Sequence, residues 1–261
     1  MAFNIFKRKE EPIILDCYTY SHYAYNFAKI DHARKYIPDW WKSQPRVSTE
    51  GEKTIKYCSA VRDYYATGIV IPLWGEVEIT VHPKGKSYEV DYEWRSSNED
   101  FNLHSGNHVK DQWGGFGNDN LRNIKFISPW AIKTRDDVQF AWTQPTWSQP
   151  DNFNRLTLLP GVIQFKTQIG TNVNYVIEIG AEEQKICIEP LTPMAMLHPM
   201  TERKVELRHH LVSPDKHAKI FRKGGGMLLN ENSVLDPNSR INVRNRKFWK
   251  KADELNKCPF E

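Results

Sequence analysis

The sequence predicts a mainly β protein: an antiparallel β-sandwich or jelly-roll-like core with a few peripheral helices and a basic helical C-terminal tail. Two observations predict this class. Apolar and polar residues alternate over many short segments, and turn residues such as "HPKGK", "TRDD" and "LLPG" separate them. Short connections of this kind join antiparallel strands, whereas parallel strands need long crossovers. The 261 residues lie within the range that sandwiches and barrels fill as one unit.

Period-two alternation over four to eight residues is typical of a strand with one buried face. The strands expected on this ground are residues 54–61, 75–82, 87–94, 137–143, 161–170, 174–180 and 184–190. The last two strands are expected to form a hairpin through Gly180 and Ala181. Its apolar face would carry Ile177 and Ile186, and its polar face would carry Glu178.

Three segments have the pattern of helices. Residues 28–44 contain Pro38, which suits the first turn of a helix. Residues 213–226 begin with the N-cap candidate Ser213, and residues 243–257 place apolar side chains on one face. We therefore expect a β-sandwich core over 1–212, with a helix near 28–44, and a helical basic extension over 213–261.

Composition and cysteine spacing indicate the expected compartment and argue against a membrane protein and a thiolate metal site. The chain has no window of about 18 apolar residues, and its start lacks the apolar region of a secretory signal. A cytoplasmic protein is therefore expected, with no membrane partner. The four cysteines are far apart, which argues against a thiolate metal cage and favours reduced thiols.

The stretch "LHSGNHVKDQWGGFGND" (103–119) is the first candidate site. A helix that would bring His104 and His108 onto one face is disfavoured by the Ser-Gly-Asn between them, but a loop can still converge two imidazoles. With Asp111 the two histidines would form a two-histidine, one-carboxylate metal site, and Glu182 or His198 are alternative third ligands. The other interpretations are loop hydrogen bonds or direct ligand contacts. The glycines of "GGFG" are expected to serve a tight turn around Phe116.

Aromatic side chains among amides and hydroxyls form the second candidate. The proline-punctuated segment 142–153 mixes Trp142 and Trp147 with Gln, Thr and Asn, a composition that suits sugars, peptides or a protein partner. Packing in the core is the alternative for the tryptophans. The candidate ligand-binding surface is His104, His108, Trp113, Phe116, Trp142 and Trp147.

Two further segments are candidates for interaction. The methionine-rich residues 191–204 would be either an adaptable interface or a core filler. Residues 214–257 hold eleven Lys/Arg against five Asp/Glu, so the basic tail 240–257 is a candidate for nucleic acid. A solvated helix face is the alternative, and the interleaved Asp253 and Glu254 weaken the case for nucleic acid.

The order of several short motifs carries a resemblance. "LDCYTY", "IPDWW", "GIVIPLWG", "QWGGFG", "IKFISPWAIKT", "LTLLPGVIQF" and "EIGAEEQKICIEPLTP" together resemble a family of uncharacterised β-rich proteins of bacteria and phages, known only as a domain of unknown function. The resemblance covers about residues 13–205. It implies a shared β framework and brings no established catalytic residues. The aromatic, Asn- and Lys-rich character also looks like that of a phage accessory protein.

The resulting hypothesis is a phage-type or bacterial accessory protein that acts as a ligand-binding, partner-binding or structural β module. No cofactor is expected on this hypothesis; its partners would be a protein or a small polar ligand, and self-association is open. One alternative is a jelly-roll, metal-dependent enzyme, like a non-haem iron oxygenase, with a divalent metal on His104 and His108. The other is a virion component, located in the virion and not free in the host cytoplasm.

Overall fold

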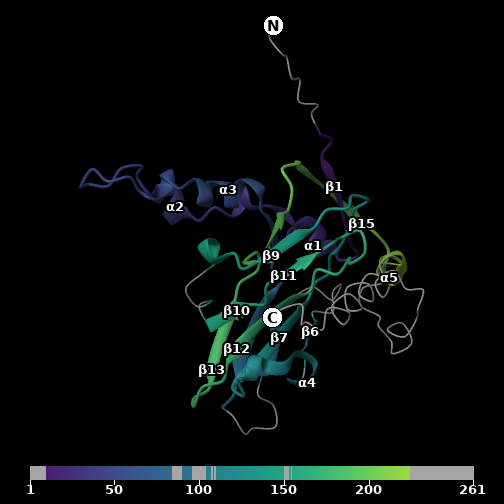
Figure 1. Ribbon diagram of the computed structural model, residues 1–261. Helices are drawn as coiled ribbons and strands as arrows, with labels where there is room; N and C mark the ends of the chain where they lie inside the picture. The colour runs from purple at the N-terminus through teal and green to yellow at the C-terminus, as the bar shows by residue number, and fades with distance from the viewer. Residues whose placement is uncertain are drawn as a thin grey trace, which may run out of the picture.

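The computed structural model describes residues 10–83, 90–95, 104–106, 108, 110–149, 153 and 155–223. These residues form a mainly β protein with few helices, as the alternation predicts (Figure 1). The strands fall into four sheets among the described residues. Among the described residues, all strand pairings are antiparallel except that of the first and last strands.

The first sheet joins the two ends of the described chain. Its order is β15 (Val205–Leu211), β1 (Ile13–Thr19) and β8 (Ala131–Lys133). β1 lies parallel to β15 and antiparallel to β8, and every second residue of β1 is buried. On the other face, Nε2 of His210 lies 2.8 Å from Oδ1 of Asp16. His209 turns the opposite way, with Nε2 2.7 Å from the Ile30 carbonyl oxygen, as expected for neighbours in a strand.

The second sheet has two largely buried strands at its centre. Its order is β11 (Gly161–Ile163), β9 (Phe140–Thr143), β14 (Pro193–Pro199), β3 (Ile69–Pro72) and β2 (Asp31–His32). All four residues of β3 and the first five of β14 are buried. Met194 and Met196 are fully buried, so within the methionine-rich segment these two side chains fill the core.

The remaining two sheets face one shared core. One has the order β10 (Leu156–Leu158), β12 (Val173–Glu178), β7 (Leu121–Ile127) and β6 (His104–Gly106). The other has the order β13 (Gln184–Ile188), β4 (Glu76–Val81) and β5 (Val90–Arg95). Buried side chains of both sheets, such as Ile79 and Phe126, belong to the same apolar cluster.

The predicted hairpin of residues 174–190 is wrong in its pairing. β12 pairs with β7 and β10, whereas β13 pairs with β4, in another sheet. The alternation itself is correct, because Ile177, Ile179, Ile186 and Ile188 are all buried while Glu178 is exposed. Alternation identifies which face of a strand is buried, but it does not identify the partner strand.

Residues 54–61, predicted as a strand, are helical. They form η2 (Ile55–Tyr57) and the start of α3 (Ser59–Thr67). Val61 and Tyr65, one helical turn apart, are buried in a small second cluster with Met196. The apolar spacing fits a helix here because i and i+4 share one face of a helix.

Residues 28–44 do not form the continuous helix that was expected. β2 interrupts the segment, followed by η1 (Ala33–Tyr36) and the short α2 (Asp39–Ser43). Pro38 has an extended backbone and precedes α2 as its N-cap. A proline also disfavours helical geometry in the residue before it, which separates the two turns. A further helix, α1 (His22–Asn26), lies upstream and is capped by the Ser21 hydroxyl.

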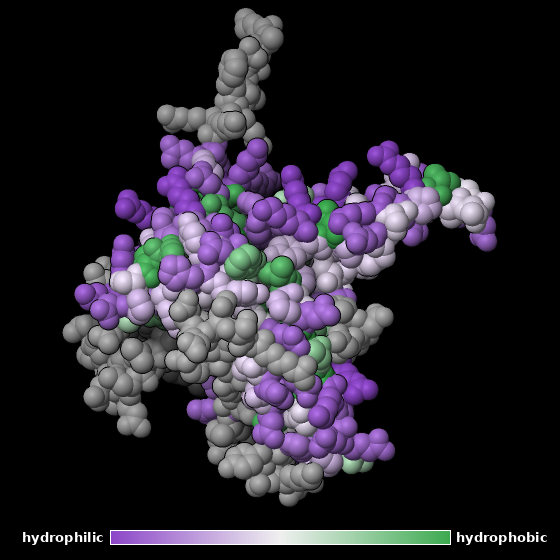
Figure 2. Space-filling model, turned by 180° about the vertical axis from the view of Figure 1, so that it is seen from behind, coloured by the Kyte–Doolittle hydropathy of each residue, from purple (hydrophilic) through white to green (hydrophobic). Residues whose placement is uncertain are grey.

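α2, α3 and the segment between them form an arm that projects from the body (Figures 1 and 2). A single antiparallel bridge, Val47 with Lys53, joins the two sides of the arm near its tip. At its base the exposed Trp40 packs against Trp147 of η4 (Thr146–Ser148), with 6.3 Å between ring centroids.

α5 (Pro214–Lys223) lies within the range for which a helix is expected after the core. His217 of this helix is buried, and its ring packs edge-on against Tyr20, so α5 lies on the end of the first sheet. The predicted helix 243–257 and the basic tail 240–257 lie outside the described residues. No described helix is both long and apolar enough to span a membrane. Cys17 is buried and Cys58 and Cys187 are exposed, while Cys258 lies outside the described residues.

A candidate binding pocket on the outer face of a sheet

The sheet of β10, β12, β7 and β6 turns one face to the core and the other to a pocket. Ile124 of β7 and Tyr175 of β12 point into the core and are fully buried. Asn123 and Asn174 are their neighbours in sequence, so their side chains leave the opposite face of the sheet. The alternation that builds the core therefore also places two amides on the outer face.

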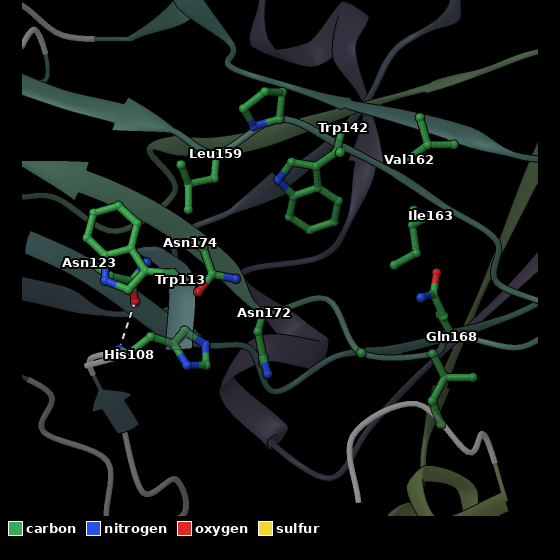
Figure 3. A pocket seen from close by; sticks show the side chains of 14 residues that line it. His108, Trp113, Asn123, Trp142, Leu159, Val162, Ile163, Gln168, Asn172 and Asn174 are labelled. Atoms are coloured by element: carbon green, nitrogen blue, oxygen red, sulfur yellow. Dashed lines mark hydrogen bonds between the residues drawn. The ribbon is translucent and has the colours of Figure 1, made fainter. Parts of the chain in front are cut away.

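The pocket has a volume of about 420 Å³. Its walls are β7 and β12, the loop before β7, the end of β9, and the connections around β11 (Figure 3). The lining residues are His108, Trp113, Asn123, Trp142, Leu159, Pro160, Gly161, Val162, Ile163, Gln168, Ile169, Gly170, Asn172 and Asn174.

Two of the three asparagines are held by backbone groups. Asn123 is 2% exposed; its Nδ2 donates to the Tyr175 carbonyl at 3.2 Å, and its Oδ1 accepts the His108 N–H at 3.0 Å. The second bond fixes the loop that carries His108 against β7. Oδ1 of Asn172 accepts the Ser128 N–H at 3.0 Å.

The third asparagine has an unsatisfied acceptor. Oδ1 of Asn174 is buried and has no hydrogen-bond donor among the described residues. Leaving a buried carbonyl oxygen without a donor costs about 1–3 kcal/mol. Figure 3 places Asn174 among Trp142, Asn172 and His108, at the centre of the pocket. A ligand hydroxyl or N–H would supply the missing donor there.

Two tryptophans contribute to the apolar surface of the pocket, together with aliphatic residues around β11. Trp142, 8% exposed, comes from β9, where it pairs in register with Gly161 of β11. Trp113 comes from α4 (Lys110–Trp113), and the next turn, η3 (Gly114–Gly117), folds Phe116 edge-on against it with 5.4 Å between ring centroids. Gly114 and Gly117 have positive φ, so the glycines of this motif serve a tight turn, as the sequence predicts.

The pocket is electrically neutral in its lining. Among the described residues that line it, none is Asp, Glu, Lys or Arg. Nδ1 of His108 lies 3.2 Å from Oε1 of Gln112, another uncharged partner. The nearest cation by strand register is Lys125, opposite Asn174, and burial lowers the pKa of its ammonium group. The walls thus offer amides and aromatic faces without a fixed charge.

The structure brings three of the six candidate ligand-binding residues together, since His108, Trp113 and Trp142 all line this pocket. Of the other three, two lie outside the pocket lining, and the side chain of the third is not among the described parts of the structure. Phe116 is 69% exposed and touches Trp113 from outside the lining, and Trp147 packs against Trp40. His104 lies in β6 opposite Ile127, and its side chain lies outside the described part of the structure.

The candidate metal ligands are only partly described. The side chains of His104 and Asp111 lie outside the described part of the structure, so the triad with His108 stays a prediction. Of the alternative ligands, His198 has Nδ1 3.4 Å from the Thr67 hydroxyl, and Glu182 borders a different hollow. No group of three or more His, Cys, Asp or Glu suited to a metal occurs among the described residues.

The asparagines are the site residues that sequence reasoning missed. A signal was present: asparagine is depleted in strands, yet Asn123 and Asn174 each lie inside a segment whose alternating residues are apolar. Reading that signal required knowing that β7 and β12 are neighbours, which follows only from the sheet order.

The fold and the site define a class: a mainly β protein with a neutral, amide- and aromatic-lined pocket on the outer face of an antiparallel sheet. Protein-family models, curated proteins and solved structures were each compared with the chain, and none matches it.

Proposed function

We propose that this protein is a binding module that holds a neutral saccharide in the pocket of His108, Trp113 and Trp142. The observation that carries the proposal is the unsatisfied Oδ1 of Asn174, buried in a pocket that Trp113 and Trp142 also line. A sugar ring combines the two properties that such a site recognises, hydroxyl donors on its edge and an apolar C–H face.

The neutral lining supports this ligand class over charged ones. A phosphate or carboxylate ligand would need a cation or a helix N-terminus, and none contributes to the described lining. Aromatic and amide groups are the usual means of fixing a small neutral ligand in a pocket of this size. The carboxamides of Asn123 and Asn172 are already oriented by backbone hydrogen bonds, so little side-chain order is lost on binding.

The proposal includes a β-sandwich as the scaffold. Its support is the contact between two sheets: Trp94 of β5 packs edge-on against Phe126 of β7, with 6.1 Å between ring centroids. Buried residues of β4 and β12 belong to the same apolar cluster. A sandwich of this kind would hold the outer face of β7 and β12 rigid beneath a ligand. The jelly-roll connectivity and the phage origin stay predictions.

The test makes the same Trp→Ala substitution at two positions, one inside the pocket lining and one outside it. Trp113→Ala removes an aromatic wall of the pocket, whereas Trp147→Ala removes a tryptophan outside the lining. Binding to a panel of neutral mono- and oligosaccharides is measured on an array and then by calorimetry. We expect Trp113→Ala to weaken binding about tenfold or more, which corresponds to about 1.4 kcal/mol, and Trp147→Ala to leave it unchanged.

Circular dichroism of both variants establishes that each is folded. Equal loss of binding in the two variants, or no binding of any saccharide by the wild-type protein, would contradict the proposal. Stoichiometric iron, zinc or manganese in protein purified without a polyhistidine tag would favour the metal-dependent enzyme instead.

A further inference from the structure

A second hollow lies on the same outer face as the pocket. It has a volume of about 910 Å³ and is bordered by the ends of β10, β12 and β7 and by the connection from β12 to β13. Its lining residues are Leu121, Arg155, Thr157, Val176, Glu178, Ile179, Gly180, Ala181, Glu182, Glu183 and Gln184.

The strand register makes the two hollows neighbours. On β12, Asn174 lines the first hollow and Val176, two residues on, lines the second. On β7 the same step separates Asn123 from Leu121, and Val176 pairs directly with Asn123. A step of two residues keeps side chains on one face of a strand.

The third strand repeats this step. After β10, Leu159 lines the first hollow, while Thr157 within β10 lines the second and pairs with Val176. β10 and β12 pass from one hollow to the other at the same level, whereas β7 does so one residue pair further along, because Asn123 in the first hollow pairs with Val176 in the second. The two hollows therefore meet along adjacent rows of side chains on this face of the sheet.

The second hollow differs from the first in its chemistry. Glu178 and Glu182 are exposed, and Arg155 donates from Nη1 to Oε1 of Gln184 at 3.1 Å. Oε2 of Glu183 lies 2.9 Å from Nδ1 of His82. Carboxylates accept hydrogen bonds and a guanidinium donates them, so this end of the face can bind several hydroxyl groups at once.

We infer that the two hollows form one groove for an oligosaccharide, with one sugar unit at Trp113 and Asn174 and further units running along β12 toward Glu178. This inference rests on the proposed function and adds the length and direction of the ligand. From Asn174 to Glu178 the strand spans about 13 Å, at 3.2–3.4 Å per residue, which exceeds the length of a single sugar ring. A monosaccharide would leave the second hollow empty.

The test measures affinity against chain length. Calorimetry uses the monosaccharide identified on the array and its linear oligomers of two to five units. We expect the oligomers to bind about tenfold more tightly than the monosaccharide, and Glu178→Gln and Arg155→Ala to remove this gain while leaving monosaccharide affinity unchanged. Glu206→Gln, on β15 and away from both hollows, is the matched control for the removal of one exposed carboxylate.

The two levels of the proposal fail differently. If the monosaccharide and all oligomers bind with equal affinity, or if Glu178→Gln and Arg155→Ala keep the gain with length, the groove is wrong and the pocket stands. If neither the monosaccharide nor any oligomer binds, both the groove and the proposed function are wrong.

Discussion

Two asparagines on neighbouring strands differ in whether their side chains stabilise the fold. Both leave the outer face of the sheet, but Asn123 uses its amide to join the Tyr175 carbonyl to the His108 N–H, whereas Oδ1 of Asn174 has no described donor. One side chain therefore stabilises the protein, and the other leaves a polar atom unsatisfied. A residue of the second kind is expected where a ligand completes the hydrogen bonding.

This contrast predicts opposite effects of one substitution. Asn174→Val removes the unsatisfied carbonyl and places a β-branched residue in a strand, so the free energy of unfolding is expected to rise by about 1 kcal/mol while saccharide binding is lost. Asn123→Val removes the hydrogen bonds to the Tyr175 carbonyl and to the His108 N–H and is expected to lower the free energy of unfolding by about 1–3 kcal/mol. Chemical denaturation and calorimetry measure both quantities. A stability loss in Asn174→Val would mean that its amide serves the fold.

At the scale of elements, the sequence predicted which face of each strand is buried better than it predicted which strands pair. The isoleucines of β12 and β13 are buried as the alternation requires, yet the two strands belong to different sheets. Residues 54–61 satisfied the same pattern and became helical, because Val61 and Tyr65 also match a helical face. Short apolar periods fit both structures, and only the surrounding core selects between them.

The pairing of β13 with β4 predicts a disulfide. Glu78 and the exposed Cys187 are register partners, so Glu78→Cys places two cysteines opposite one another. Mild oxidation is expected to join them within one chain, as detected by thiol titration and peptide mass spectrometry. Val176→Cys, on the strand that a hairpin would place beside β13, is the control and is expected to form no such bond. A disulfide in the control alone would contradict the sheet order.

At the scale of the whole molecule, one buried and two half-buried histidines make stability depend on pH. Burial lowers the pKa of His198, His209 and His217 below the ordinary value of about 6.5. Below about pH 6.5 the unfolded chain therefore binds protons that the folded chain does not, and the folded state loses stability as the pH falls. The ordinary pKa values of Asp and Glu side chains, about 3.9 and 4.3, lie below the range from pH 7 to pH 5 in which the imidazoles act.

The expected result is a fall in the thermal unfolding midpoint between pH 7 and pH 5. Differential scanning fluorimetry in buffers of equal ionic strength measures it. His198→Gln removes one of the three imidazoles and should make the dependence shallower. A midpoint that stays constant from pH 7 to pH 5 would show that these side chains accept protons in the folded state at little cost.

The sequence by itself determined that the protein is mainly β, which residues of most strands face the core, and that the "GGFG" turn needs glycine. These properties depend on local periodicity and local backbone geometry, and residues close together in the sequence determine both. It also singled out His108, Trp113 and Trp142, because aromatic and imidazole groups in Gly- and Pro-rich loops are conspicuous.

Only the tertiary structure decided which strands are neighbours, and with that decision came the site. Asn123 and Asn174 are 51 positions apart in the sequence, and the pocket exists because β7 and β12 pair beneath the β9 and β11 edge. Strand pairing is governed by contacts between distant segments, whose energies depend on the packing of the whole core. A local pattern contains no information on those contacts.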